Sequence, residues 1–303
     1  MTDRGVQRGG DRLIRALAMD GLLRVTVVRT TALVGELARR HAMTPVAAAA
    51  TGRVATAALM LGTTLKDEQV LTLHVRGGGP LGMLRATANA HGTVRAYATH
   101  PKASVADGSV ATAVRGDDPE RMPGGRGGGV LEVVKDLGLK DPYHGLVPLA
   151  TGTIYDDVAY YLMMSEQTSS AVALGESQDA KGVVVSAGGY LVQALPGVGE
   201  EVEERIGQLP RIDHMLGDAQ MTLEEVLARL LPESDARVVS NYPVSFVCGC
   251  SREKLAVGLR LIGRKETWSI LREEGSPLQL RCHFCNDVYY FTESQLQAIF
   301  TEH

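Results

Sequence analysis

All four cysteines of the 303-residue chain lie in two short segments, Phe246-Val247-Cys248-Gly249-Cys250 and Cys282-His283-Phe284-Cys285. Each segment presents two thiolates on one tight turn, as C-x-C and as C-x-x-C. Two such turns can close a tetrahedral zinc site with Zn–S distances of about 2.3 Å. The spacing therefore predicts one zinc ion per reduced chain, bound by Cys248, Cys250, Cys282 and Cys285. His283 is a weak candidate ligand, because four thiolates already fill the zinc shell.

The distribution of aromatic residues also separates the C-terminal region, which holds the cysteines, from the rest of the chain. All four Phe and the single Trp, Trp268, come after residue 240, whereas the residues before it offer mainly Ala, Val, Leu and Met for a core. A folding unit of about 60 residues needs large apolar side chains and usually a metal or disulfide staple. We therefore expect a large N-terminal core domain at 1–196 and a small C-terminal zinc domain at 238–303.

The N-terminal region mixes helices with β-hairpins. Thr44 can cap a helix that has Pro45 at its first position. The dipeptide His91-Gly92 lies between two alternating segments and predicts a hairpin turn, and Gly188-Gly189 predicts another. Because hairpins outnumber strand–helix–strand units, the sequence favours an α+β domain with sheets and helices.

A helical linker is expected at 197–237, between the two domains. Val198, Val202 and Ile206 repeat at helical spacing, and Thr222 with Glu225 fits a capping box that opens a second helix. Ile212, Met215 and Leu216 suggest a short apolar turn between these helices. On the pattern alone, an ordinary pair of surface helices also accounts for this stretch.

Charge and composition exclude several classes of protein. The net charge is −4, and the region after residue 239 has as many acidic as basic residues, which argues against nucleic acid and anionic membranes as partners. A 45% apolar composition excludes general disorder. No secretory leader or spanning segment is expected, so the chain is predicted to be cytoplasmic. Cysteines kept reduced in that compartment indicate a metal or redox site.

No motif supports an enzyme. The loop Gly77–Gly82 matches G-x-G-x-x-G, but a strand pattern follows it, and a dinucleotide site needs a helix there. Pro80 also removes one backbone donor, so the loop is interpreted as a glycine-rich turn. An ATP-binding phosphate loop is missing from the sequence. We therefore assign no catalytic and no cofactor-binding residue.

The cysteine site itself leaves several interpretations open. On spacing alone, a static structural zinc domain is favoured over a nucleic-acid-binding zinc ribbon. A redox switch is also possible, since zinc-bound thiolates are nucleophilic and the adjacent pairs can close as Cys248–Cys250 and Cys282–Cys285 disulfides that no longer hold zinc. A thiol–disulfide oxidoreductase would need C-x-x-C at the start of a helix, whereas the segment after Cys285 has a strand pattern. Arg252, Arg281 and His283 either attract anionic oxidants or are solvated surface charges.

The flanking residues resemble a known family. The pattern Phe246-x-Cys248-x-Cys250-Ser251-Arg252-Glu253, with Cys282-x-Phe284-Cys285-Asn286 and Tyr289 to Phe291, is similar to the redox domain of the thirty-three-kilodalton heat-shock protein, a redox-regulated holdase chaperone. Upstream, Gly77–Pro80 and Tyr161–Gln167 resemble that family's glycine loop and its helix ending in Ser-Glu-Gln. The likeness spans most of the chain.

The resemblance implies a function that spacing alone does not give. In the family, the reduced, zinc-bound form is inactive. Peroxide with unfolding stress, or hypochlorite, oxidises the four cysteines and expels zinc. The C-terminal domain and linker then lose structure, and the protein dimerises and holds unfolding client proteins without ATP, before ATP-driven foldases receive them. The loop at 124–129 is richer in glycine than the family leads us to expect.

Overall fold

The computed structural model describes residues 10–116, 129–210, 221–232 and 234–301, and the glycine-rich loop at 124–128 lies outside them. The chain forms two compact units, Met1–Phe246 and Val247–His303. The sequence placed the start of the second domain at 238. In the structure the larger unit continues to Phe246, because residues 237–246 form strands that pair with its two sheets.

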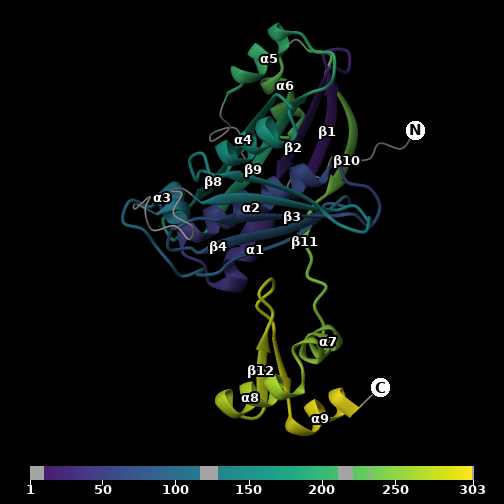
Figure 1. Ribbon diagram of the computed structural model, residues 1–303. Coiled ribbons are helices and arrows are strands. Elements are labelled where there is room, and N and C mark those ends of the chain that lie inside the picture. The colour runs from purple at the N-terminus through teal and green to yellow at the C-terminus, as the bar shows by residue number, and fades with distance from the viewer. Residues whose placement is uncertain (1–9, 117–128, 211–220, 233, 302–303) are drawn as a thin grey trace, which may run out of the picture. The chain divides into compact units, whose positions relative to one another are not determined.

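The larger unit contains two sheets (Figure 1). The first is antiparallel throughout, and its strands follow in the order β10 (Arg237–Pro243), β1 (Arg12–Ala18), β2 (Leu23–Arg29), β9 (Val184–Ala194) and β8 (Ser170–Gln178). The second has the order β11 (Ser245–Phe246), β5 (Thr93–Ala98), β4 (Met83–Asn89), β3 (Val70–Arg76), β6 (Val130–Asp136) and β7 (Tyr143–Pro148). Only the β11–β5 pair is parallel among the pairs described in it. The predicted α+β class is confirmed.

The core helix α2 (Pro45–Gly62) contacts strands of both sheets, and α1 (Thr31–His41) packs beside it. Its start is as predicted: Pro45 is its first residue, and Thr44 Oγ1 accepts a hydrogen bond from the Ala47 N–H at 3.3 Å. By length and hydropathy alone α2 could cross a membrane, but 89% of it is buried inside the fold. Its run of alanines lets two sheets approach one helix closely, which places α2 in the core.

The two predicted hairpin turns had different outcomes. Strands β4 and β5 pair antiparallel around His91-Gly92, which confirms the first turn. The turn predicted at Gly188-Gly189 is wrong, because both glycines lie inside β9, which pairs with β2 and β8. A Cβ at Gly189 would stand 2.6 Å from the Ala173 carbonyl oxygen, so this glycine permits close strand approach.

The loop Gly77–Gly82 is a glycine-rich turn followed directly by β4, as expected. Its glycines lie against α3 (Val110–Arg115), where a Cβ at Gly77 would stand 1.8 Å from the Val114 carbonyl oxygen. The Gly79 N–H donates to that same carbonyl at 3.0 Å. The glycines therefore serve tight backbone packing.

The helix α4 (Tyr155–Ser165) contains the first five residues of the Tyr161–Gln167 motif and ends before its Glu166 and Gln167. Its buried Asp157 accepts hydrogen bonds from the backbone N–H groups of Thr151, Gly152 and Ile154 at 2.9, 3.2 and 3.0 Å. At the other end, the buried Tyr161 hydroxyl donates to Glu166 at 2.8 Å, and Glu166 also binds Lys135 of β6. The motif thus fixes α4 to the second sheet.

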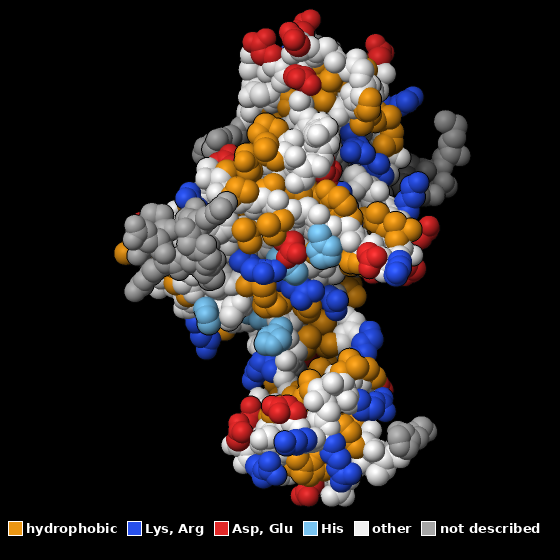
Figure 2. All heavy atoms as spheres, viewed as in Figure 1, with side chains coloured by type: hydrophobic (Ala, Val, Ile, Leu, Met, Phe, Trp, Pro, Cys, Tyr) orange, Lys and Arg blue, Asp and Glu red, His pale blue; other side chains and the backbone are white. Residues whose placement is uncertain are grey.

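The linker helices α5 (Glu200–Gly207) and α6 (Leu223–Leu230) cover strands of the first sheet. Their apolar side chains join a second hydrophobic cluster that includes Val202, Ile206, Val226, Leu227, Ile14 and Val27. The acidic run of α5 faces solvent, where Figure 2 shows red side chains gathered over this helix. The turn expected at 212–216 lies outside the described residues. The apolar side chains of α5 and α6 are therefore buried against the first sheet when the thiols are free.

The capping box of α6 is present as predicted. Thr222 Oγ1 accepts from the Glu225 N–H at 3.2 Å, and Glu225 accepts from the Thr222 N–H at 2.7 Å. We expect Thr222→Ala to destabilise α6 by about 1 kcal/mol, because the N-terminal donors lose their acceptor. Hydrogen exchange of the α6 amides measures this opening, and Thr222→Ser, which keeps a hydroxyl, should stay close to the parent. Equal protection in all three proteins would show that the cap contributes nothing.

The smaller unit consists of three helices and one hairpin in its described residues, coloured yellow in Figure 1. These are α7 (Arg252–Ile262), α8 (Arg264–Glu274), β12 (Leu278–Arg281), β13 (Val288–Phe291) and α9 (Glu293–Thr301). Its cluster of buried apolar residues is small: Leu259, Leu271, Leu278, Phe291 and Leu296. Trp268 packs edge-on against Phe300, with ring centroids 5.6 Å apart. A core of this size usually needs a bound metal or a disulfide in addition to stabilise the fold.

Candidate metal centre

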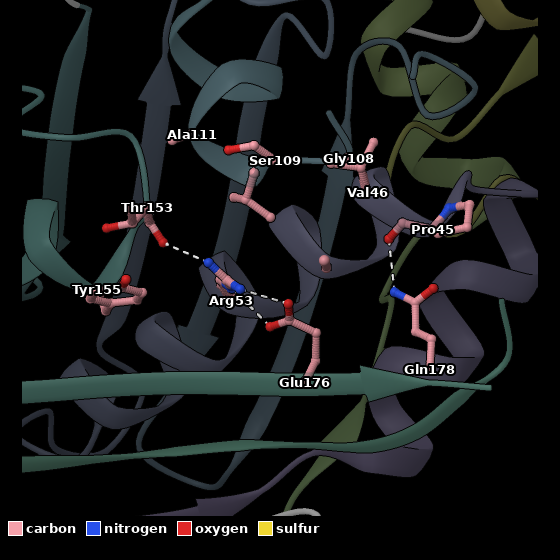
Figure 3. Close-up of a pocket in the computed structure, with 12 residues that line it drawn as sticks. Pro45, Val46, Arg53, Gly108, Ser109, Ala111, Thr153, Tyr155, Glu176 and Gln178 are labelled. Atoms are coloured by element: carbon pink, nitrogen blue, oxygen red, sulfur yellow. Dashed lines mark hydrogen bonds and ion pairs between the residues drawn. The ribbon is translucent and has the colours of Figure 1, made fainter. Parts of the chain in front are cut away.

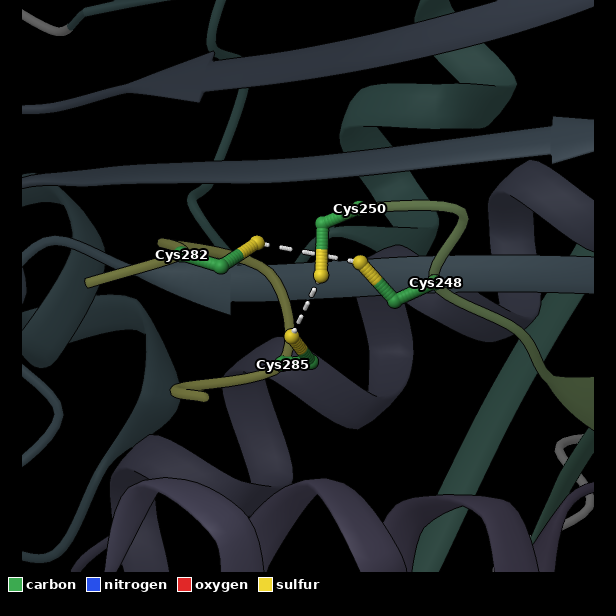
Figure 4. A group of neighbouring side chains, drawn as sticks. All are labelled: Cys248, Cys250, Cys282 and Cys285. Carbon is green, nitrogen blue, oxygen red and sulfur yellow. Dashed lines mark hydrogen bonds between the residues drawn. The ribbon is translucent and has the colours of Figure 1, made fainter. Parts of the chain in front are cut away.

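The four cysteine sulfurs converge on one point from the two predicted turns (Figure 4). All four lie within 4.8 Å of one another, with Cys248 and Cys282 sulfurs 3.7 Å apart and Cys250 and Cys285 sulfurs 3.2 Å apart. All four are free thiols. Because a tetrahedral Zn–S distance of about 2.3 Å requires S···S separations of about 3.8 Å, the donor set fits one zinc ion.

The first turn connects β11 to α7. Ser251 is the N-cap of α7 and accepts from the Lys254 N–H at 3.3 Å, so the helix begins directly after Cys250. The Lys254 ammonium donates to the Gly249 carbonyl. In the same turn the Cys250 N–H donates to the Cys248 sulfur. Local hydrogen bonds therefore hold both sulfurs of the C-x-C pair on the same side of the chain.

The second turn connects β12 to β13. The Asn286 N–H donates to the Cys282 carbonyl at 2.8 Å, and the Cys282 N–H donates to the Asp287 carbonyl at 2.9 Å. Asn286 has a φ of +65°, in the left-handed region that Asn tolerates better than most residues. The Asp287 N–H donates to the Cys285 sulfur. The turn thus orients two sulfurs and gives one of them a backbone donor.

The sulfurs differ in their acid–base properties. Burial raises the pKa of Cys285 strongly, although the Asp287 N–H opposes the shift. Burial also raises the pKa of Cys248, against the opposing Cys250 N–H. For Cys250, burial is outweighed by hydrogen bonds from Tyr289 and the other thiols, which lower its pKa. Because a metal ion binds thiolates, an ion that bound these four sulfurs would displace the thiol protons and release them.

Tyr289 lies at the thiol cluster, although from the sequence it was named only within the family-like pattern Tyr289 to Phe291 and was given no role at the cysteines. Its hydroxyl lies 3.2 Å from the Cys250 sulfur, and this contact raises the pKa of Tyr289. The signal in the sequence was the alternation of β13, which sends Tyr289 and Tyr290 to opposite faces. The alternation of side chains along β13 does not by itself show which face of the strand lies toward the cysteines.

The basic residues near the cysteines have partners in their own unit. Arg252 donates to Gln295 at 2.6 Å and lies over the Phe291 ring, 4.3 Å from its centroid. Arg281 donates to Asn286 Oδ1 at 3.0 Å. These two cations therefore have structural contacts, and the group that could hold a metal consists of the four thiols without His283.

A separate hollow of about 490 Å³ lies in the larger unit, between the start of α2 and β8 (Figure 3). Arg53 occupies it and binds Glu176 through two hydrogen bonds of 2.7 and 2.8 Å, while also donating to the Thr153 carbonyl at 3.3 Å. The guanidinium of Arg53 and the carboxylate of Glu176 in this hollow therefore neutralise each other. Within the described residues, the thiol cluster is the stronger candidate for chemistry.

Comparison with known proteins gives one family. The family model described as Hsp33 protein matches residues 11–292. A 33 kDa chaperonin of Desulforamulus reducens is 42% identical over 95% of this chain and 97% of its own length, and one of Geobacillus kaustophilus is 40% identical over 96% and 97%. The crystal structure of a Thermotoga maritima 33 kDa chaperonin has a TM-score of 0.83 and 31% identity, covering 96% of this chain and 97% of that one.

Proposed function

The chain belongs to the Hsp33 family, and from that premise we propose that it is an ATP-independent holdase whose activity is switched on by oxidation. Membership of the family supports a chaperone role with unfolded proteins as partners. We further propose that Cys248, Cys250, Cys282 and Cys285 hold zinc in an inactive reduced form and become two disulfides in the active form.

The observation that carries the proposal is the convergence of four free thiols within 4.8 Å, in a unit with a small core of its own. When bound, zinc keeps the four sulfurs as thiolates and links the two turns. Structural zinc contributes on the order of 10–16 kcal/mol in small domains, whereas whole domains are stable by about 5–15 kcal/mol. Loss of the ion is therefore expected to unfold this unit.

The oxidation balances with peroxide as the oxidant. One thiolate attacks the O–O bond, forms an S–O bond and expels hydroxide, so its sulfur gives up two electrons and becomes a sulfenic acid. A second thiolate attacks that sulfur, forms the S–S bond and expels a second hydroxide. Two peroxides thus convert four thiolates into two disulfides, which we assign as Cys248–Cys250 and Cys282–Cys285. A disulfide no longer offers thiolate ligands.

Unfolding of the linker supplies apolar surface for clients. In the reduced state α5 and α6 bury Val202, Ile206 and Val226 against the first sheet. Release of these helices would expose both the linker's apolar face and the sheet beneath it. In the proposed cycle, the oxidised chain forms a homodimer in the cytoplasm and later passes its clients to ATP-driven foldases.

An aggregation assay tests the switch. A heat-denaturing client is followed by light scattering with the reduced zinc-bound protein and with protein treated with peroxide at elevated temperature. We expect suppression of scattering only after oxidation, and peptide mapping should find the two sequence-adjacent disulfides. Equal suppression by both forms would leave a static zinc domain. Catalytic disulfide turnover at substoichiometric protein would favour an oxidoreductase, although Cys285 is followed by β13, with no helix opening at that pair.

The zinc content of the reduced protein is a separate prediction. Four converging thiols should bind one zinc per chain, and Cys282→Ser should bind it much more weakly because one thiolate is lost. Metal analysis with thiol titration measures both. Ser269→Ala, which changes a hydroxyl on α8, should keep the full zinc content. Substoichiometric zinc in freshly reduced parent protein would contradict the proposed site.

A further inference from the structure

The hairpin β12–β13 positions one hydroxyl against the thiol cluster. In β13, Tyr289 is paired opposite Leu280 of β12, and its ring packs on the hydrophobic cluster of the small unit. Its hydroxyl reaches the Cys250 sulfur at 3.2 Å. The next residue, Tyr290, is 52% exposed on the other face of the strand. The ring therefore anchors Tyr289, while its hydroxyl is directed at a single sulfur.

The hydrogen bonds to the four sulfurs are unequal. Cys248 and Cys285 each accept a backbone N–H from their own turn. Cys250 receives the Tyr289 hydroxyl, a side-chain donor from outside the cysteine cluster. A substitution other than proline leaves the backbone N–H donors in place. The contact at Cys250 comes from a side chain, so substitution of Tyr289 can remove it and leave the backbone donors unchanged.

We propose that the Tyr289 hydroxyl, by donating a hydrogen bond to the Cys250 thiolate, restrains the reactivity of that one sulfur toward electrophiles and oxidants. A donated hydrogen bond withdraws electron density from a metal-bound sulfur, which lowers its nucleophilicity and tunes the site. Tyr289 is thus a positioning and tuning residue that acts through Cys250. The inference rests on the proposed zinc site. It predicts that Cys250 differs in reactivity from the other three cysteine ligands.

The test compares Tyr289→Phe with Tyr290→Phe in the full-length, reduced, zinc-loaded protein. Both variants keep the aromatic ring, and only the first loses a hydroxyl at the cluster. Iodoacetamide is the probe: the thiolate displaces iodide and forms a C–S bond, and peptide mass spectrometry gives the rate at each cysteine. Zinc content and Trp268 fluorescence are recorded on the same samples.

We expect Tyr289→Phe to raise the alkylation rate at Cys250 by about 2- to 10-fold, the range that corresponds to one hydrogen bond. The rates at Cys282 and Cys285 should change less, and Tyr290→Phe should match the parent. An unchanged rate at Cys250 would overturn the inference. An equal rise at all four cysteines, or loss of zinc or of native fluorescence, would also overturn it by showing a general structural role. Absence of zinc from the parent would instead refute the proposed function.

Discussion

Removal of zinc from the reduced protein is expected to unfold Val247–His303 while Met1–Phe246 stays folded. The small unit has five buried apolar residues in its cluster, whereas the larger unit has two extensive clusters. A metal contribution of about 10–16 kcal/mol exceeds what so small a core supplies. A strong chelator under reducing conditions should therefore abolish the structure of one unit only.

The chain provides a direct measurement of this result. Trp268 is the only tryptophan, and it packs against Phe300 within the zinc unit. Its emission should shift to longer wavelength on chelation and return when zinc is added back. Hydrogen exchange of the β2 and β9 amides, in the larger unit, serves as the control and should be unaffected. Native Trp268 emission in zinc-free reduced protein would show that the unit folds without its metal.

The substitution Val226→Asp is expected to activate the chaperone without oxidation. Val226 is fully buried on α6, in the cluster between the linker and the first sheet. An unpaired carboxylate at this position costs about 3–5 kcal/mol, enough to detach a helix of eight residues. The reduced, zinc-bound variant should then suppress client aggregation and show faster hydrogen exchange in α6.

The matched control is Ala228→Asp, which adds the same charge to the exposed face of the same helix. It should leave both the reduced protein's inactivity and the α6 exchange rates unchanged. If Val226→Asp opens α6 but gives no suppression of aggregation, the linker's apolar face is not part of the client surface. Zinc content measured on both variants ensures that the cysteine site is intact.

The sequence was most informative where chemistry depends on residues close together in the chain. Both cysteine turns could be predicted, because C-x-C and C-x-x-C each place two sulfurs on one turn. The helix starts at Thr44 and Thr222 were also predictable, since capping needs only a hydroxyl and the next few residues. These features depend on local geometry, and the structure confirms each of them.

Features that depend on distant pairing could not be predicted in the same way. Gly188 and Gly189 looked like a turn, but they lie in an interior strand whose neighbours, β2 and β8, come from elsewhere in the chain. The contact of Tyr289 with Cys250 spans 39 positions and depends on which face of β13 meets the cysteines. Residues 238–243, which belong to β10, were placed in the second domain because their pairing with β1, more than 200 residues away, leaves no local signal.

The strand β10 has one further consequence. Among the described strands it is an outer one that pairs with β1 alone, and after β11 the chain reaches Cys248 within two residues. Peeling β10 away would break one ladder of hydrogen bonds, where removal of an interior strand would break two. It would leave the backbone donors and acceptors of β1 open, which is the arrangement that extended peptides recognise. The folded protein therefore covers this edge of β1 with its own chain, and the covering strand lies only a few residues before the first of the four clustered cysteines.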